Sequence, residues 1–299
     1  MLSILIPVYN TNVTILVDRL REQGLKLDVP FEIVVLDDAS DHFFFSKNSI
    51  IADWNEVRLI RERKKLGRSG SRNKLATLAI YNYLLFIDGD AAVPDEDFLS
   101  TYYRYCRGNV IICGGTSYHA DPPESQDLFF RWKYGVKRES VPAVKRNKNP
   151  NAGFSSFNFL IVKKIFLAVR FNEELHGYGH EDTLFGYELQ QKGFRVTHID
   201  NPLLHEGLEP HDEFKRKSVE GLKNLQRLII QMPEAKDFIR QVRLLRMYHR
   251  LKKFRILPLP EFLGRKLLRL TNKKTNLPDP NLFMFDIYKL LYYSSLNKP

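Results

Sequence analysis

The segment that most constrains the fold is the apolar run LLFI at residues 84–87, which is followed at once by Asp88, Gly89 and Asp90. Four consecutive apolar residues are typical of a strand buried on both faces of a parallel sheet. Gly89 allows a sharp turn where this strand ends, so both carboxylates should lie at the carboxyl edge of the sheet, where open α/β sheets bind ligands. Two carboxylates there suit a hard divalent cation that holds a diphosphate. An acidic turn without a ligand is the alternative.

Strand-like and helix-like patterns alternate along the first 200 residues. Strands are predicted over residues 3–8, 31–36, 57–60, 110–115, 158–162 and 194–202, and helices over residues 11–24, 74–83, 94–105, 163–169 and 183–192. Residues 116–150 combine aromatic side chains, a proline pair and a basic run, which predicts either a mobile loop that closes over a ligand or a surface excursion. The alternation predicts an α/β fold with a doubly wound, mostly parallel sheet.

Polar segments follow several of the predicted strands. The first strand should end near Pro7, because proline cannot donate to a central ladder, and the second strand ends in Asp37 and Asp38. Residues 61–65 and 67–73 are basic, the second stretch contains two glycines, and we expect them to form a loop that opens the next helix. Such a loop can cradle phosphate through its N–H groups and arginines, although a solvated basic surface also fits.

The segment GYGHED at residues 177–182 precedes a predicted helix. Its acids, Glu181 and Asp182, fit either a helix cap or a general base at the rim of the ligand cleft. His205 follows the last predicted strand. A lone histidine is more often structural than a ligand, but a metal bound nearby would favour ligation by a neutral imidazole.

Composition places the chain among folded proteins, with 43% hydrophobic and 27% charged residues in 299. The two cysteines, Cys106 and Cys113, cannot form a disulfide framework, which suits a reducing cytoplasm. The first eight residues are too short for a secretory signal, and no apolar run reaches the roughly 20 residues of a spanning helix. We therefore expect a cytoplasmic protein.

Positive charge is concentrated at the C-terminal end. Residues 211–299 hold 20 Lys+Arg against 8 Asp+Glu, which is +12, so that 26 against 27, or −1, remain in residues 1–210 of a chain whose total is +11. Residues 234–255 carry arginines at three- and four-residue intervals beside apolar residues, which predicts one basic amphipathic helix. Such a helix can lie on an anionic membrane surface or pack its apolar face on the protein.

These motifs together resemble the family 2 glycosyltransferases, the inverting enzymes with the nucleotide-diphospho-sugar-binding fold called GT-A. The resemblance covers roughly residues 1–210 and rests on Pro7-Val8-Tyr9-Asn10, Asp37-Asp38-Ala39-Ser40, Arg72-Asn73 preceded by Gly67 and Gly70, Asp88-Gly89-Asp90 and Glu181-Asp182. The segment GYGHED also looks like the donor-site motif of animal β-galactosyltransferases and bacterial chondroitin polymerases, which have a downstream metal-binding histidine that His205 matches.

The resemblance implies a GT-A domain over residues 1–210, with a nucleotide-sugar-binding half (1–115) and an acceptor-binding half (116–210), and a basic, mainly helical region over residues 211–299. It implies donor binding by Pro7, Tyr9, Asp37, Asp38, Gly67, Arg72, Asp88, Gly89 and Asp90, with Tyr9 packed on the base and Asp37-Asp38 at uracil and ribose. Asp90, His205 and Asp88 would hold Mn²⁺ or Mg²⁺. Asp182 would be the general base beside Glu181, and Gly179, His180, Glu181 and Trp132 would bind the acceptor.

The implied reaction is transfer of a sugar from a UDP-sugar donor to a hydroxyl of a glycan or lipid-linked acceptor, in bacterial surface polysaccharide or glycolipid assembly, at the inner face of the membrane. The Gln-X-X-Arg-Trp motif of processive synthases is absent, which favours transfer of a single sugar. A nucleotidyltransferase acting on a sugar phosphate is the alternative that shares the fold and the metal. A nucleic-acid-binding protein would explain only the charge, and the sequence carries no signature for specific nucleic-acid recognition.

Overall fold

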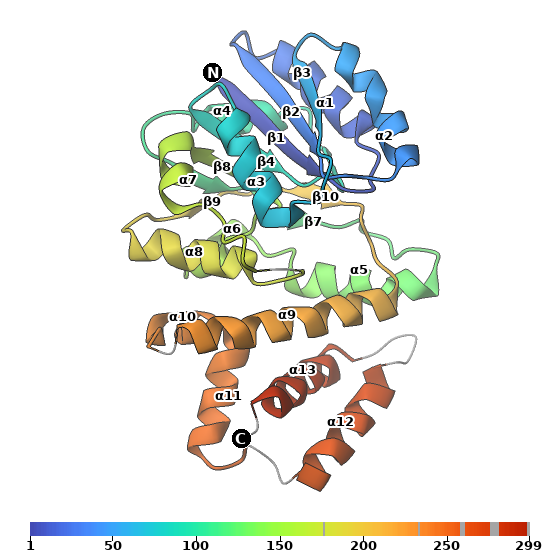
Figure 1. Cartoon of the computed structure of the whole chain (residues 1–299), viewed down its shortest axis with the longest axis vertical. Coiled ribbons are helices and arrows are strands. Elements are labelled where there is room, and N and C mark those ends of the chain that lie inside the picture. The colour runs from blue at the N-terminus through green and yellow to red at the C-terminus, as the bar shows by residue number, and fades with distance from the viewer. Residues whose placement is uncertain (176, 233, 258–260, 276–280, 298–299) are drawn as a thin grey trace. The chain divides into compact units, whose positions relative to one another are not determined.

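A computed structural model describes residues 1–299 except 176, 233, 258–260, 276–280 and 298–299 (Figure 1). The chain forms two compact units. Unit 1 contains residues 1–119, 138–174 and 182–207, and unit 2 contains residues 120–137, 175–181 and 208–299. Segments 120–137 and 175–181 thus belong with the C-terminal helices, although they lie within the range expected to form one catalytic domain.

Unit 1 is built on a seven-stranded sheet in the order β3-β2-β1-β4-β8-β6-β9. The strands are β1 (Leu2–Val8), β2 (Phe31–Asp37), β3 (Val57–Arg61), β4 (Tyr83–Ile87), β6 (Ile111–Cys113), β8 (Asn158–Val162) and β9 (Thr197–His198). β8 runs antiparallel to both of its neighbours, whereas the other pairs are parallel. The predicted, mostly parallel sheet is therefore confirmed, with β8 as its antiparallel strand.

A second, three-stranded sheet in the order β5-β10-β7 lies in the same unit. It consists of β5 (Ala91–Ala92), β7 (Thr116–Ser117) and β10 (Leu203–His205). β5 follows the Asp88-Gly89-Asp90 turn directly, and its Ala91 pairs with His205 across the antiparallel β5–β10 ladder. This small sheet brings His205 beside a turn that precedes it by more than a hundred residues.

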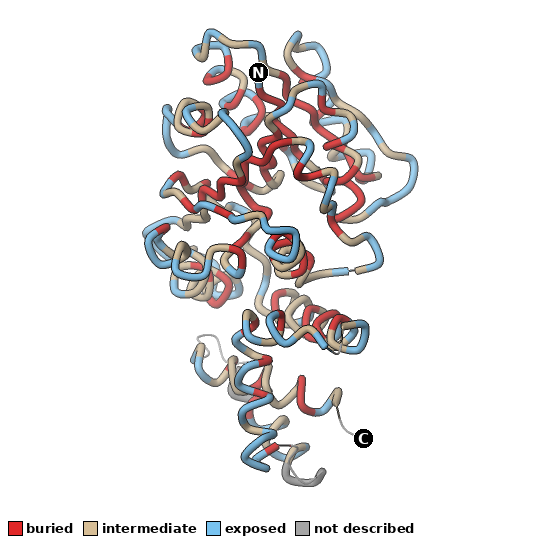
Figure 2. The backbone as a smooth tube through the Cα atoms, turned by 90° about the vertical axis from the view of Figure 1, so that its left-hand side faces the viewer, coloured by how far each residue is buried: buried red, intermediate tan, exposed pale blue. Residues whose placement is uncertain are grey.

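Helices flank the main sheet on both faces. They are α1 (Thr14–Leu25), α2 (His42–Asn48), α3 (Gly67–Leu78), α4 (Phe98–Tyr103), α6 (Ala143–Arg146), α7 (Lys163–Val169) and α8 (Glu181–Gln191), with 3₁₀ turns η1 (Ser49–Asp53) and η2 (Asn151–Gly153). Successive residues of β1 are buried in two different hydrophobic cores. Ile4 belongs to the core that contains Leu20 of α1, and Leu5 belongs to the core that contains Leu75 of α3. Residues of β1, β2, β4 and β8 are buried almost throughout, and Figure 2 shows the buried residues in the interior of the fold.

Several elements differ from the sequence prediction. Residues 67–73 are the first turns of α3 and not a loop, and the helix ends at Leu78 because Tyr83 already opens β4. Residues 116–150 are not one long loop, since they contain β7, α6 and the helix α5 (Gln126–Arg138). The helix expected over 94–105 is confined to α4, the strand expected over 110–115 shortens to β6, and the strand expected over 194–202 shortens to β9.

Unit 2 is helical. Besides α5 it contains α9 (His211–Gln231), α10 (Lys236–Gln241), α11 (Arg243–Lys253), α12 (Glu261–Thr275) and α13 (Leu282–Leu296). Its core packs Phe130 of α5, Phe214 of α9, and Phe285 and Tyr288 of α13. None of the described helices combines the length and apolar character that crossing a membrane requires.

The single helix predicted over residues 234–255 is wrong. Val242 adopts an extended conformation (ψ 113°) that separates α10 from α11. The apolar face that the pattern identified is nevertheless buried, since Phe238, Val242, Leu245 and Tyr248 are each at most 8% exposed. Packing inside unit 2 therefore already uses this face.

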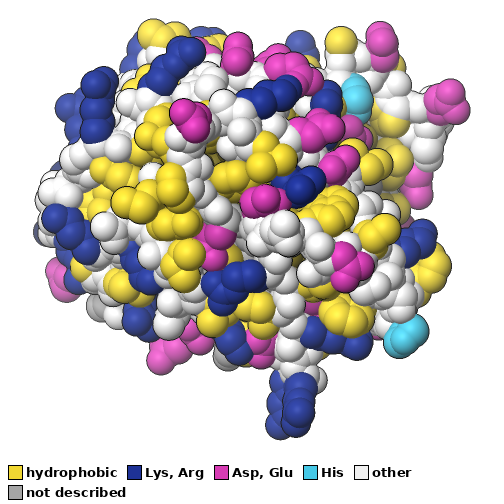
Figure 3. All heavy atoms as spheres, turned by 90° about the horizontal axis from the view of Figure 1, so that it is seen from above, with side chains coloured by type: hydrophobic (Ala, Val, Ile, Leu, Met, Phe, Trp, Pro, Cys, Tyr) yellow, Lys and Arg dark blue, Asp and Glu magenta, His cyan; other side chains and the backbone are white. Residues whose placement is uncertain are grey.

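Charge is mixed on the face of the molecule that is seen from above. Basic and acidic side chains are interspersed there, with exposed apolar side chains between them (Figure 3). This mixture contrasts with the excess of +12 that the sequence places in residues 211–299.

Candidate active site

The turn after β4 holds two carboxylates at the carboxyl edge of the main sheet, as predicted. Asp88 accepts a hydrogen bond of 2.5 Å from Nη2 of Arg72, which is only 2% exposed. Nε and Nη1 of Arg72 have no hydrogen-bond partner among the described residues. A buried guanidinium with unused donors is costly unless a ligand completes its bonding, so Arg72 is equipped to bind an anionic or carbonyl group at this turn.

His205 lies beside the second carboxylate of the turn. Its Nε2 is 3.7 Å from Oδ2 of Asp90, and its ring lies between those of Tyr118 and Phe157, with centroids at 5.4 and 5.3 Å. Burial raises the pKa of Asp90 and the charge of Asp88 adds to this shift, whereas the electrostatic interactions of Asp90 with His205 and Arg68 oppose it. The imidazole thus packs on two aromatic rings while its Nε2 lies near the carboxylate of Asp90.

The Asp90 and His205 pair fits one divalent cation. Metal bonds to carboxylate oxygen and imidazole nitrogen are about 2.0–2.2 Å long, so two ligand atoms 3.7 Å apart can share a cation. No cluster of three or more His, Cys, Asp or Glu side chains suited to a metal occurs in the described parts of the chain. A cation at this pair would therefore need ligands from a bound diphosphate and water, as is usual for Mg²⁺.

Close backbone approaches keep this turn compact. A Cβ atom at Gly207 would lie 2.4 Å from Oδ2 of Asp90, and one at Gly89 would lie 3.2 Å from the carbonyl oxygen of Pro7. The N–H of Glu206 donates to the carbonyl of Asp90 at 2.9 Å. Gly207 is therefore required beside the carboxylate, and the ends of β1 and β4 adjoin through Pro7 and Gly89.

The loops after β1 and β2 are joined by side-chain hydrogen bonds. The backbone N–H of Asn10 donates to Oγ of Ser40, and Asn10 exchanges two further bonds with Asp41. Tyr9, the residue before Asn10, is 46% exposed, and Nζ of Lys65 lies 3.3 Å from the centroid of its ring. The exposed ring offers a stacking surface at the carboxyl edge of the sheet, and Lys65, from the predicted basic segment 61–65, is a cation there.

The acidic pair after β2 is buried and supports the start of α3. Asp38 accepts hydrogen bonds from the N–H groups of Leu66 (2.6 Å) and Gly67 (2.9 Å), and Asp37 accepts one from the N–H of Ser40 (2.9 Å). The expected phosphate-cradling loop is thus replaced by a helix whose first amides already bind Asp38. Among the described residues, Oδ2 of Asp37 has no hydrogen-bond partner.

Asp182 is tied to the same edge of unit 1 through the residues that precede β8. Its Oδ2 accepts a hydrogen bond of 2.9 Å from the N–H of Ser156, and the next carbonyl, that of Phe157, accepts the N–H of Asp88 at 3.1 Å. Asp182, Asp88 and His205 thus all contact the segment Ser156–Phe157. The sequence analysis missed this segment because it has no titratable side chain and no motif spacing.

The remaining predicted site residues belong to unit 2. Gly177 and Gly179 have positive φ (84° and 96°), and the amide of Asn224 on α9 donates to the carbonyls of Tyr178 and Gly179. Burial lowers the pKa of His180 to about 4, so its imidazole is neutral near pH 7. Glu181 is 8% exposed, and Trp132 of α5 packs on Phe129 with centroids 5.5 Å apart.

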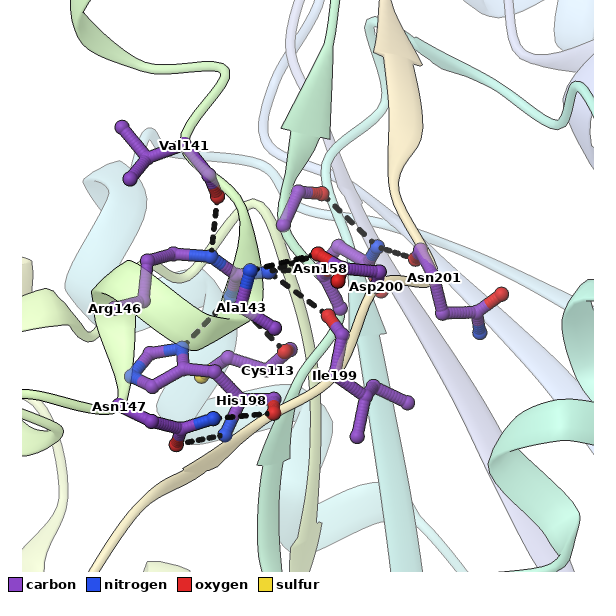
Figure 4. A network of polar contacts seen from close by, with 12 residues as sticks. Cys113, Val141, Ala143, Arg146, Asn147, Asn158, His198, Ile199, Asp200 and Asn201 are labelled. Carbon is purple, nitrogen blue, oxygen red and sulfur yellow. Dashed lines mark hydrogen bonds and ion pairs between the residues drawn. The ribbon is translucent and has the colours of Figure 1, made fainter.

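A polar network in unit 1 is centred on Arg146 (Figure 4). Its guanidinium donates to the carbonyls of Cys113 (3.1 Å) and Gly114 (2.9 Å) and contacts Nδ1 of His198 at 2.7 Å. Asn158, the first residue of β8, donates to the carbonyl of Asn201 at 2.9 Å. The network fixes the strand ends that border residues 156–157.

His198 fits this network only as a neutral ring. Nδ1 must accept from Arg146, so Nε2 carries the proton and donates to the carbonyl of Pro150 at 2.8 Å. Burial lowers the pKa of His198; the bond to Pro150 opposes this shift and the charge of Arg146 adds to it. A protonated ring would direct a second N–H at the guanidinium.

We predict that the free energy of unfolding decreases as the pH is lowered below about 6.5, which is the ordinary pKa of histidine. In this pH range the unfolded chain binds more protons than the folded chain. The stability that neutral His198 contributes is therefore fully present above about pH 6.5, and it decreases as the pH falls toward the lowered pKa of His198 in the folded chain. In urea titrations, the free energy of unfolding of His198→Gln should decrease less between pH 7 and pH 5 than that of the wild type. His42→Gln, at an exposed histidine, is the control and should keep the wild-type profile. Parallel profiles for His198→Gln and the wild type would contradict this linkage.

Comparison with known proteins adds sequence and fold relatives. The family model described as glycosyl transferase family 2 matches residues 3–166. The chain is 23% identical over 184 residues to the glycosyltransferase GlyG of Streptococcus pneumoniae, covering 58% of this chain and 60% of GlyG. It is 24% identical over 246 residues to the chondroitin synthase of Pasteurella multocida, covering 71% of this chain and 25% of that protein. The chain thus matches less than two thirds of either relative.

Solved structures share the fold at low identity. The mannosyltransferase PcManGT of Pyrobaculum calidifontis, in complex with GDP-Man and Mn²⁺, superposes with a TM-score of 0.58 at 14% identity, covering 99% of this chain and 86% of that one. S. aureus TarS 1–349 in complex with UDP-GlcNAc gives a TM-score of 0.52 at 17% identity, covering 99% and 91%. The GT-A fold expected from the sequence is confirmed.

Proposed function

Because the chain belongs to glycosyl transferase family 2, we propose that it transfers a sugar from a UDP-sugar to a hydroxyl group of a glycan or lipid-linked acceptor. The observation that carries this proposal is the grouping of Asp88, Asp90, Arg72 and His205 at the carboxyl end of β4. A fold neighbour that binds UDP-GlcNAc supports a uridine donor, and one that binds GDP-Man makes guanosine the competing nucleotide. Assembly of bacterial surface polysaccharide or glycolipid is the setting we propose, with one sugar added per acceptor.

The donor is proposed to bind along the ends of β1, β2 and β4. The exposed ring of Tyr9 would stack on the base, Asp37 would accept from uracil or ribose, and the unused donors of Arg72 would bind base or phosphate. Pro7, Asp38, Gly67 and Gly89 shape this surface. Asp90 and His205, with Asp88 nearby, would hold Mn²⁺ or Mg²⁺, and that cation would supply charge neutralisation of the leaving diphosphate.

Asp182 is proposed to act as the general base. The N–H of Ser156 donates to one oxygen of its carboxylate and thereby fixes the position of the side chain at the edge of unit 1. The carboxylate would take the proton of the acceptor hydroxyl, whose oxygen attacks the anomeric carbon while the bond to the diphosphate breaks. A single displacement inverts the anomeric configuration. Gly179, His180, Glu181 and Trp132 are proposed to contact the acceptor, in keeping with the GYGHED resemblance.

We predict that UDP binding depends on a divalent cation at Asp90 and His205. Calorimetric titration of UDP should give an affinity at least about tenfold higher with Mn²⁺ than with a chelator, because the cation neutralises diphosphate charge beside two carboxylates. Asp90→Asn should abolish this difference, whereas Asp95→Asn, on the connection after β5, should retain it. Equal affinity with Mn²⁺ and with chelator in the wild type would remove the cation from the proposal.

Asp182→Asn should lower kcat by about 10²-fold or more, with UDP affinity nearly unchanged, because it removes a base and no donor ligand. Asp212→Asn, at the first turn of α9, is the control for loss of a helix-start carboxylate and should leave kcat near wild type. NMR coupling constants should show an inverted product. Near-wild-type turnover of Asp182→Asn, or retention of configuration, would reduce Glu181 and Asp182 to a helix cap. Transfer of the nucleotide instead of the sugar from a doubly labelled donor would identify a nucleotidyltransferase.

Contact of unit 2 with an anionic membrane surface is the proposed route to a lipid-linked acceptor. Helix α11 exposes its basic side chains, and Met247, Phe254 and Ile256 beside them are 44–63% exposed. The predicted apolar face is buried within unit 2, so the binding we propose is chiefly electrostatic with shallow insertion.

The triple variant Arg243→Gln, Arg246→Gln, Arg250→Gln should bind phosphatidylglycerol-containing vesicles at least about 100-fold more weakly, since each basic residue near such a surface is worth roughly 1 kcal/mol. The matched control removes three exposed arginines of unit 1: Arg104→Gln, Arg107→Gln, Arg195→Gln. Vesicle co-sedimentation at low salt measures both, with UDP binding as the check on folding. Equal binding by the two triple variants, or no binding by the wild type, would make α11 a packing element.

A further inference from the structure

A cavity of about 330 Å³ lies along one face of α9 in unit 2. Its lining residues recur at the three- and four-residue intervals of a single helix face. They are Arg216, Val219, Glu220, Lys223, Asn224 and Arg227. A volume of this size lies at the lower end of the range for small-molecule sites.

The lining carries more positive than negative charge, with three cations against the single carboxylate of Glu220. Arg216 is engaged by Glu213 at 2.7 Å and by Glu220 at 3.4 Å. Lys223 makes no ion pair with any described residue, and Arg227 donates only to the amide oxygen of Asn224, at 3.2 Å. Lys223 and Arg227 therefore present uncompensated charge to the cavity.

The cavity adjoins the segment proposed to contact the acceptor. The amide of Asn224, one of its lining residues, donates to the carbonyl of Tyr178 at 3.2 Å and to that of Gly179 at 3.4 Å. The carboxylate of Glu220 lies so close to Gly177 that a side chain at this position would force it to move. A molecule that contacts Gly179 and His180 can therefore extend into the cavity.

We propose that this cavity binds a phosphate group of the acceptor, so that the enzyme uses a phosphate-bearing glycan or lipid. The inference rests on the proposed transferase function, because it names the class of acceptor. Lys223 would act as a point charge and Arg227 would donate through its planar fork, the two modes by which these side chains bind phosphate. The cavity is larger than a phosphate alone requires, which leaves room for the adjoining sugar or glycerol. Glu220 would limit how many negative charges are accepted.

The test is calorimetric titration of glucose 1-phosphate, and of neutral glucose, into full-length protein saturated with UDP and Mg²⁺. Saturation prevents the probe from occupying the donor site. The wild type should bind glucose 1-phosphate more tightly than glucose. The variant Lys223→Gln, Arg227→Gln should bind glucose 1-phosphate about 100-fold more weakly, roughly tenfold for each lost charge-assisted bond, with its weak affinity for glucose unchanged.

The double variant Arg104→Gln, Arg107→Gln is the matched control, because it removes the same charge from exposed positions of unit 1. It should retain wild-type affinity for glucose 1-phosphate. Equal affinity in the wild type and the Lys223, Arg227 variant, or no preference of the wild type over neutral glucose, would overturn the inference. UDP affinity, measured separately, reports on the donor site, so failure of the proposed function is distinguishable from failure of this inference.

Two sources of phosphate are separated by competition. Displacement of glucose 1-phosphate by dioctanoyl phosphatidic acid would place a lipid phosphate in the cavity. Displacement by a soluble glycerol phosphate oligomer and not by the lipid would place a glycan phosphate there. Either result requires Lys223 and Arg227, and displacement that persists in their double variant would contradict the site.

Discussion

The antiparallel placement of β8 between β4 and β6 is the constraint on which the site of unit 1 depends. Ile87, the last residue of β4, pairs with Asn158, the first residue of β8. Because the two strands run in opposite directions, the residues that precede β8 arrive at the edge where β4 ends. Ser156 and Phe157 are thereby delivered beside Asp88, and they bind Asp182, Asp88 and the ring of His205. A parallel β8 would send this segment to the opposite edge.

The sequence predicted the parts of the fold that local pattern determines. Buried strands such as β2 and β4 appear as apolar runs, and the acids after them were placed at the carboxyl edge without knowledge of their partners. Strand direction and long-range pairing have no such signal. The pairing of β5 with β10, which sets His205 beside Asp90, joins two- and three-residue strands too short to give a period. Likewise, nothing local indicates that the N–H of Ser156 binds Asp182.

Residues 67–73 show how tertiary contacts override a local preference. Two glycines and two serines disfavour a helix, yet α3 begins at Gly67. The carboxylate of Asp38 accepts a hydrogen bond from the N–H of Gly67, and residues further along the helix are buried. The helix then carries Arg72 into the interior, where Asp88 balances its charge. A buried arginine in a rigid helix has less freedom than one in a loop. The guanidinium is consequently preorganised, which lowers the entropic cost of binding an anion.

Within unit 2, α9 both holds the 177–180 segment in place and lines the basic cavity. Near the start of α9, the ammonium of Lys217 donates a hydrogen bond to Glu209, and Glu209 also accepts one from the buried Arg131 of α5. The same ammonium lies 5.4 Å from the ring centroid of Tyr178. Two turns later, Asn224 holds the carbonyls of Tyr178 and Gly179. These contacts fix the 177–180 segment against the helix whose neighbouring side chains line the basic cavity. Under the acceptor-phosphate proposal, substitutions at Lys223 or Arg227 would alter which acceptor is bound while the carboxylates after β4, in unit 1, stay the same.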